Sequence, residues 1–168
     1  AQTSYLYDKN GDIITAYSDS ENRDWVSIDE IPDTLQKAFV AVEDKRFYSH
    51  QGFDIKRLGG AILNQLLRKD VYGGSTITQQ LIKNTILNDD PTYKRKVQEL
   101  YLAVNLEKKM SKTEILEAYL NIIYLGDSNY GVKTAAQDYF GKDLNELTLK
   151  ECALLAGLTK NPYALQPI

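Results

Sequence analysis

The chain has 168 residues, of which 43% are hydrophobic, a length and composition that suit one domain with its own core. The formal net charge of −3 argues against general nucleic-acid binding, and the lone cysteine excludes an internal disulfide and a cysteine-ligated metal site. No run reaches the roughly 18 apolar residues of a membrane span. The polar start Ala1–Ser4 carries no signal-peptide pattern.

Residues 1–30 are predicted to form an N-terminal β segment. The β-prone runs 5–7 and 13–17 flank an Asn-Gly pair, which is typical of a β-hairpin. After Pro32 the pattern becomes helical, with Asp33 as a candidate N-cap. The expected architecture is therefore mainly α, with a short hairpin followed by six or seven helices.

The first cluster with chemical potential is Glu43–Gly52. Glu43 follows an apolar run, so it sits where a helix leaves the core, and a partly desolvated glutamate suits a general base. His50 lies seven residues further on and shares the face of Glu43 only if the helix continues. The alternative is a solvated, charged helix end with a hydrogen-bonded histidine.

Residues 55–69 carry four cations and no acid. Their apolar positions, among them Ile55, Leu58 and Ile62, recur at helical spacing. A basic helix with an apolar face can lie on an anionic membrane surface. The alternative is an ordinary helix that faces the core.

The second cluster is Gly73–Gln80. Its two glycines allow close backbone approach, and Thr76 and Gln79 have capping-box spacing. The free N–H groups of such a helix start can bind a phosphate, and Lys83 can extend from the same face as the two glutamines. The alternative is a well-capped helix after a glycine turn.

The third cluster is Lys94–Glu99, after a break at Asn88–Pro91. Arg95 and Glu99 are spaced i,i+4, and Lys96 and Glu99 are spaced i,i+3. They either form surface pairs worth about 0.3–0.5 kcal/mol, or the three adjacent cations clamp a pyrophosphate with Glu99 holding one in place. The spacing leaves both interpretations open.

The fourth cluster, 112–126, has a strong helical period and is predicted to be a central packing helix. Glu117 and Asn121 on it, spaced i,i+4, are expected to brace neighbouring loops. Three positions complete the local predictions. Ser111 and Thr148 start helices with capping-box spacing, and Gly141 is a candidate helix C-cap.

Taken together, the four clusters resemble the motifs of the family 51 glycosyltransferases. These include the transglycosylase domain of class A penicillin-binding proteins and the monofunctional peptidoglycan glycosyltransferases. The matching order is Glu-Asp-x-x-Phe-x-x-His-x-Gly, Gly-Gly-Ser-Thr-Ile-Thr-Gln-Gln, Arg-Lys-x-x-Glu and Ile-Leu-Glu-x-Tyr-Leu-Asn, and the resemblance covers about residues 5–163. Four motifs at compatible intervals are far more specific than any one of them.

The resemblance implies a mainly α, lysozyme-like glycosyltransferase fold in a single domain over 1–168, with a small membrane-facing jaw subdomain at about 53–72. There are departures from the family pattern. Pro91 stands where the family usually has an arginine, and the loop 127–131 differs. The family's fifth motif has no counterpart, so the C-terminal part of the family domain is expected to be absent.

The activity implied by the resemblance is polymerisation of lipid II into glycan strands, by inverting transfer from a polyprenyl-pyrophosphate-linked donor to the 4-hydroxyl of lipid II. Glu43 and Glu99 are the implied catalytic residues, with Glu43 as the base and Glu99 as an organiser of the cations. The implied substrate-binding residues are Asp44, Phe47, His50, Ser75, Thr76, Gln79, Gln80, Lys83, Arg95, Lys96, Glu117 and Asn121. The rival interpretations are a lysozyme-like hydrolase or lytic enzyme, and a non-catalytic cell-wall binding module.

No cofactor or metal site is expected to be required, and a divalent cation (Mg or Mn) bridging the phosphates is left open. The expected partners are lipid II, the growing glycan strand and the membrane surface, which the chain contacts through residues 55–69. A transpeptidase domain is expected in the full-length chain. The expected location is the extracytoplasmic face of the bacterial plasma membrane, with an N-terminal membrane anchor that is absent from this sequence.

Overall fold

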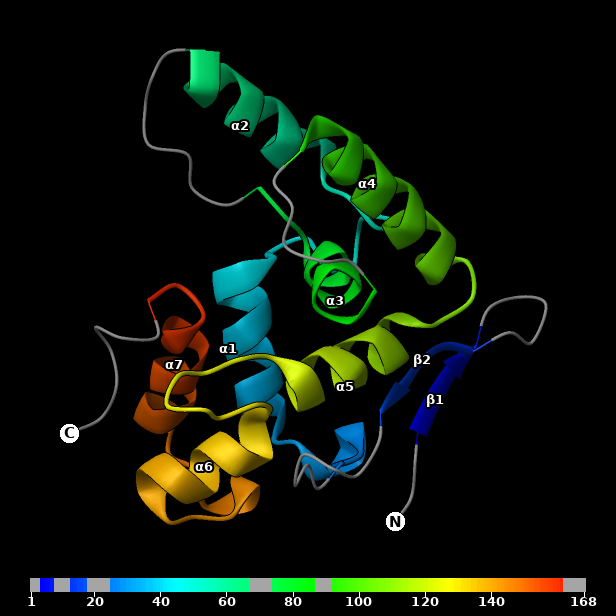
Figure 1. Cartoon of the computed structure of the whole chain (residues 1–168). Coiled ribbons are helices and arrows are strands. Elements are labelled where there is room, and N and C mark those ends of the chain that lie inside the picture. The colour runs from blue at the N-terminus through cyan, green and yellow to red at the C-terminus, as the bar shows by residue number, and fades with distance from the viewer. Residues whose placement is uncertain (1–3, 8–12, 18–24, 67–73, 87–91, 162–168) are drawn as a thin grey trace.

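The computed structural model describes residues 4–7, 13–17, 25–66, 74–86 and 92–161, with the backbone alone for 4–7, 13–17 and 61–66. Over these residues the fold is mainly α, as predicted (Figure 1). The elements are β1 (Ser4–Tyr7), β2 (Ile13–Tyr17), η1 (Ile28–Glu30), α1 (Asp33–Glu43), α2 (Ile55–Leu66), α3 (Ile77–Thr85), α4 (Tyr93–Glu107), α5 (Lys112–Ile122), α6 (Val132–Phe140), η2 (Leu144–Glu146) and α7 (Leu149–Leu158).

The two strands pair antiparallel, with Ser4 opposite Tyr17 and Leu6 opposite Thr15, and an irregularity follows Leu6. The predicted Asn-Gly turn between them falls in 8–12, outside the described residues.

Most of the predicted helix ends are confirmed. Capping boxes with both hydrogen bonds start α3 at Thr76, α5 at Ser111 and α7 at Thr148, and Gly141 ends α6 in the left-handed conformation at φ 60°. The predicted N-cap at Asp33 is wrong. Pro32 occupies the cap position and Asp33 is the first helical residue, where its negative charge still complements the helix dipole.

The core is built around α5. Its residues from Ile115 to Ile122 are buried except for the half-buried Glu117, which confirms the prediction of a central packing helix. α5 packs against α3, η1 and α6, while α1 packs along α7. Cys152 is buried in this core as an unpaired thiol. The packing therefore holds the C-terminal end of α1 next to α3 and α7, where the candidate site lies.

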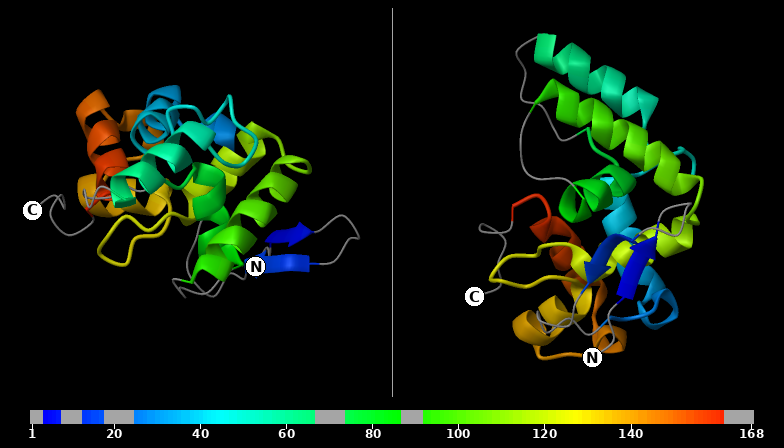
Figure 2. Two further views of the ribbon diagram at one scale, coloured as in Figure 1. Left: turned by 90° about the horizontal axis from the view of Figure 1, so that it is seen from above. Right: turned by 45° about the vertical axis from the view of Figure 1, so that its right-hand side comes forward.

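The predicted basic segment 55–69 forms α2 over its first 12 residues, and residues 67–69 lie outside the described part of the chain. α2 and α4 lie together at one end of the molecule, away from α6 and α7 (Figures 1 and 2). None of the described helices is long and apolar enough to cross a bilayer.

Candidate active site

Glu43 is the last residue of α1, and only 3% of it is exposed. Its Oε2 accepts a hydrogen bond of 2.8 Å from Nε2 of Gln80 on α3. Its Oε1 accepts a hydrogen bond from the Thr159 hydroxyl and lies 3.2 Å from the ammonium nitrogen of Lys160. The ends of α1 and α7 and the start of α3 therefore converge on one carboxylate.

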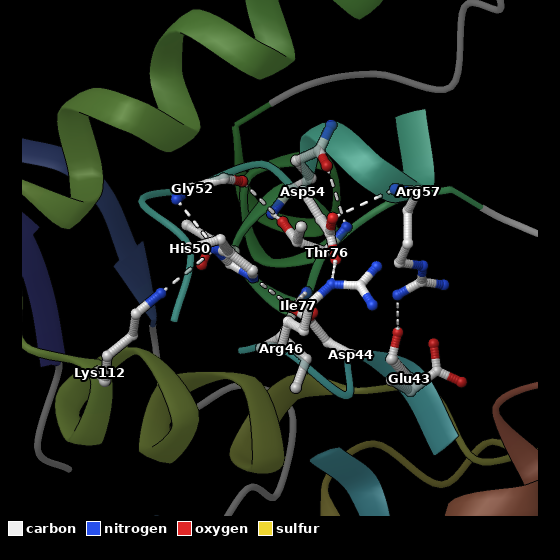
Figure 3. A network of polar contacts seen from close by, with 12 residues as sticks. Glu43, Asp44, Arg46, His50, Gly52, Asp54, Arg57, Thr76, Ile77 and Lys112 are labelled. Carbon is white, nitrogen blue, oxygen red and sulfur yellow. Dashed lines mark hydrogen bonds and ion pairs between the residues drawn. The ribbon is translucent and has the colours of Figure 1, made fainter. Parts of the chain in front are cut away.

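The α1 helix stops at Glu43 because Asp44 leaves the helical region, with φ −158° and ψ 74°. The condition under which His50 would share the face of Glu43 is therefore not met. His50 instead binds the neighbouring carboxylate, with 2.7 Å between its Nε2 and Oδ2 of Asp44. Figure 3 shows this contact at the centre of a polar network.

Asp44 is fully buried and joins this loop to α3. Its Oδ2 also accepts a 3.0 Å hydrogen bond from the backbone N–H of Ile77 in the first turn of α3, and Thr76 accepts at its hydroxyl from the N–H of Gln79. The prediction that free N–H groups at this helix start bind a phosphate is wrong for these two groups, because both already donate within the protein. These two N–H groups therefore do not contribute to a phosphate site at the start of α3.

The tautomer of His50 follows from its second nitrogen. Nδ1 accepts from the backbone N–H of Gly52 at 3.1 Å, so the ring proton is assigned to Nε2, which then donates to Asp44. The Gly52 carbonyl in turn accepts from the Thr76 hydroxyl at 2.7 Å. These bonds clamp the 44–52 loop onto the start of α3.

Phe47 anchors the 44–52 loop in the core. Its ring is fully buried and lies 4.7 Å from the ammonium group of Lys112, within the range of a cation–π contact. Lys112 also donates to Glu107 at 2.7 Å and lies 3.3 Å from Nδ1 of His50. Phe47 and His50 are thus buried against the ends of α4 and α5.

Asp54 and Arg57 tie α2 to the site. Asp54 accepts from the backbone N–H groups of Lys56 and Arg57 at the start of α2 and from the Arg46 guanidinium at 2.6 Å. The Arg57 guanidinium donates to the main-chain carbonyl of Glu43 (Figure 3). The helix predicted to lie on a membrane is therefore bonded directly to the backbone of the candidate base.

Gln80 is held by Tyr119 of α5, whose hydroxyl lies 3.2 Å from Oε1 of the Gln80 amide. Burial, together with the nearby charges of Glu43 and Asp44, raises the pKa of Tyr119 well above its usual value. Tyr119 therefore stays protonated and donates to Gln80, which leaves the amide nitrogen of Gln80 to face Glu43.

The adjacent Gln79 connects this carboxylate region to the cations of α4. Its Nε2 donates to Oε1 of Glu99 at 3.2 Å, and the same oxygen lies 2.6 Å from the ammonium nitrogen of Lys96. Lys96 also donates to the Ser75 hydroxyl at 2.8 Å. Glu99 is 5% exposed, so Lys96 is paired with a buried carboxylate. The pair is therefore not a simple surface salt bridge.

The two remaining predicted cations come from α4 and α3. Arg95 is half-buried on α4 beside Lys96, and Lys83 is exposed one turn after Gln79 and Gln80 on α3. The structure thus brings Glu43, the two glutamines, Glu99 and Lys96 into one connected arrangement across α1, α3 and α4.

Glu117 and Asn121 bind elsewhere. Oε1 of Glu117 accepts from the N–H of Ile28 at 2.6 Å, and Asn121 exchanges two 2.8 Å hydrogen bonds with the backbone of Val26. These contacts brace the segment before α1 against α5. The bracing interpretation of this cluster matches the observed contacts, while a direct contact with substrate stays a prediction.

Residues that the sequence did not single out also take part in the site, among them Arg57, Tyr119, Thr159 and Lys160. The one local signal for the last two is a polar pair directly after the apolar run that ends at Leu158. In the described ranges no group of three or more His, Cys, Asp or Glu side chains is placed to hold a metal ion.

Comparisons with known proteins identify the family of the chain. A protein-family model described as Transglycosylase matches residues 10–168. Penicillin-binding protein 1A of Clostridium perfringens (strain 13 / Type A) is 51% identical over 166 residues, which are 96% of this chain and 24% of that protein. Penicillin-binding protein 1A/1B of Bacillus subtilis (strain 168) is 49% identical over 170 residues, 99% of this chain and 18% of that protein.

The chain therefore spans a quarter or less of the length of these two relatives. A crystal structure of penicillin-binding protein 1A from Haemophilus influenzae matches 96% of this chain and 14% of that chain, with 28% identity and a TM-score of 0.39. A superposition this loose supports no comparison of site geometry.

Proposed function

Because this chain belongs to the transglycosylase family and is a peptidoglycan glycosyltransferase domain, we propose that it polymerises lipid II into glycan strands by an inverting transfer. The donor is the growing strand, carried on a polyprenyl pyrophosphate. The acceptor is the 4-hydroxyl of lipid II. The single observation that carries the proposal is the buried carboxylate of Glu43, which α3 connects to the Glu99–Lys96 pair on α4.

In the proposed reaction Glu43 takes the proton from the acceptor 4-hydroxyl as that oxygen attacks C1 of the donor sugar. The bond between C1 and the pyrophosphate oxygen breaks, and configuration at C1 is inverted. Support comes from the way the carboxylate is held, with Gln80 and Thr159 donating to its two oxygens. A base fixed from both sides can be aimed at one hydroxyl.

Lys83, Arg95 and Lys96 are proposed to stabilise the departing pyrophosphate. Pyrophosphate stabilised in this way is a good leaving group, so no general acid of the glycosidase kind is needed. Glu99 then orients Lys96, in keeping with their 2.6 Å separation, and does not carry a second proton. Ser75 adds a second hydrogen-bond partner for the same ammonium group.

We further propose that α2, as the core of a jaw subdomain in a lysozyme-like fold, lies on the extracytoplasmic face of the plasma membrane and lets the polyprenyl tail reach the site. Support comes from its lack of acids over 55–66 and from the bond between Arg57 and the carbonyl of Glu43. A membrane anchor and a transpeptidase domain elsewhere in the full-length chain complete the proposal, in line with the relatives' description as penicillin-binding proteins.

The test is turnover by the 168-residue chain of two substrates, a lipid-linked disaccharide precursor and preformed cell-wall polymer. Polymer growth from the precursor supports the proposal. Cleavage of the preformed polymer would instead identify a lysozyme-like hydrolase, and the absence of turnover of either would identify a binding module.

The Glu43→Gln variant assigns the base. It should cut turnover by about 10²- to 10⁴-fold with the fold intact, the usual range for such a group. The matched control is Glu114→Gln, the same change at an exposed capping-box position where glutamine also caps. Near-normal polymerisation by Glu43→Gln would reject the assignment.

A further inference from the structure

The outer face of α4 carries an apolar stripe that the proposed reaction does not use. Tyr93, Val97 and Tyr101 are 86%, 64% and 68% exposed, and their spacing of four residues aligns them along one side of the helix. The opposite side is formed by the buried Glu99, Ala103 and Leu106. The stripe therefore points away from the core from the first residue of α4 to Tyr101.

The charges on this face have one sign. The exposed residues of α4 are the three stripe residues, Lys94 and Gln98, and the exposed Lys108 follows as the C-cap. Both acids of α4, Glu99 and Glu107, have side chains that are nearly fully buried and paired with lysines. The solvent-facing side of the helix thus combines tyrosine rings with cations and no carboxylate.

The neighbouring helix has the same character. α2 lies at the same end of the molecule as α4 (Figures 1 and 2). At its start Ile55 is 73% exposed and Lys56 is exposed, and 55–66 contains no acid. Two helices at one end therefore present exposed apolar side chains with cations beside them.

This chemistry fits a lipid surface better than a protein. Tyrosine rings favour the headgroup level of a bilayer, and lysines can keep their apolar stems in the interface while their ammonium groups reach phosphates. A single row of three side chains on a convex helix is small beside the roughly 800 Å² per partner of a stable protein interface.

We propose that the outer face of α4 is a second membrane-contact surface, one that binds an anionic bilayer through the stripe of Tyr93, Val97 and Tyr101 and through Lys108. The proposal rests on the proposed placement of a membrane beside α2, since the two helices share one end of the molecule. Contact through two helices orients the domain on the bilayer, whereas contact through α2 alone leaves it free to tilt.

Sedimentation with vesicles of phosphatidylcholine, with and without phosphatidylglycerol, tests the surface. The triple variant Tyr93→Ser, Val97→Ser, Tyr101→Ser should bind the anionic vesicles at least about tenfold more weakly than the parent chain, because interfacial binding scales with buried apolar area. Lys108→Gln should weaken binding about fivefold, the usual effect of one basic residue near an anionic surface. The matched control, Leu149→Ser with Lys150→Gln, removes an exposed apolar residue and an exposed cation from α7 and should bind normally.

A site-specific probe adds a second readout. An environment-sensitive dye on a Tyr101→Cys variant should shift to the blue on anionic vesicles, whereas the same dye on Leu149→Cys should not. The buried Cys152 keeps labelling selective. A water-exposed dye at 101 on bound vesicles, together with normal binding by the triple variant, would overturn the proposal.

The remaining outcomes separate the two proposals. If Ile55→Ser with Lys56→Gln loses vesicle binding and the α4 triple variant does not, the α4 surface is wrong and the membrane placement of α2 stands. If the parent chain does not bind anionic vesicles, both placements fail, while turnover of a short-chain soluble precursor still tests the enzyme. A dimer in solution that the triple variant dissociates, with vesicle binding unchanged, would make the stripe a protein contact and overturn the proposal.

Discussion

The amide of Gln80 on α3 donates to the Glu43 carboxylate at 2.8 Å across 37 residues of sequence. The other end of the same amide accepts from Tyr119 at 3.2 Å. Turning the amide over would place its oxygen against the Glu43 carboxylate and lose that hydrogen bond, whereas the Tyr119 hydroxyl can donate or accept. In the observed orientation Tyr119 supports the amide oxygen of Gln80, and the amide nitrogen holds the carboxylate.

This relationship predicts a graded series of activities. Gln80→Ala removes a hydrogen bond to a charged group and should lower turnover by about 10- to 100-fold. Gln80→Glu should lower it further, because a second carboxylate then faces Glu43. Tyr119→Phe should have the smallest effect, since the amide nitrogen can still reach Glu43. Initial rates of polymerisation measure the series, and wild-type activity in Gln80→Glu would contradict it.

The Lys96–Glu99 pair predicts a separation of stability from activity. Lys96→Met leaves a buried carboxylate without its cation and should lower the free energy of unfolding by about 1–2 kcal/mol, less than for a fully buried pair because Lys96 is partly exposed. Adding Glu99→Gln should restore stability in urea unfolding but should not restore turnover. Recovery of turnover in the double variant would show that Lys96 is structural and contributes nothing to a pyrophosphate clamp.

Asn121 distinguishes a brace from a substrate contact. Asn121→Ala loses two hydrogen bonds to Val26 and one to the carbonyl of Glu117. The buried N–H and carbonyl groups of Val26 then lack these hydrogen-bond partners. The expected cost is about 2–3 kcal/mol in the free energy of unfolding, with little change in KM. The exposed Asn145→Ala is the control. Unchanged stability with a raised KM would favour a direct role in binding lipid II.

Asp54 predicts sensitivity to acid. Burial works to raise the pKa of Asp54, but the hydrogen bonds from Arg46 and from the N–H groups of Arg57 and Lys56 outweigh it and hold the pKa below its ordinary value. The carboxylate therefore stabilises the folded chain in full above the unfolded-state value of 3.8, and this contribution is lost as the pH falls through the lower folded-state pKa.

Urea unfolding at pH 6 and at pH 3 measures the effect. Between pH 6 and pH 3 the free energy of unfolding should fall more for the parent chain than for Asp54→Asn. The variant lacks the contribution of the Asp54 carboxylate at both pH values. Asp29→Asn, an exposed aspartate in η1, is the control and should lose as much as the parent. Equal losses in the parent and in Asp54→Asn would contradict the predicted role.

Features that depend on a few neighbouring residues were predictable from the amino-acid order. The capping boxes at Thr76, Ser111 and Thr148 each close within three residues, and the left-handed end of α6 at Gly141 needs only a residue without a side chain. The same holds for the central α5 helix, whose period shows in its apolar spacing. The order of the four clusters was enough to predict the family.

The site itself depends on contacts between residues far apart in the chain. Thr159 reaches Glu43 over 116 residues, and no periodicity in the sequence encodes which helix end lies beside which. His50 illustrates the same limit, because its contact with Asp44 depends on α1 ending at Glu43 and on the following loop folding back onto α3. Long-range pairs of this kind follow from the packing of α1 along α7 and of α3 against α5, where many small apolar contacts acting together place a few polar groups.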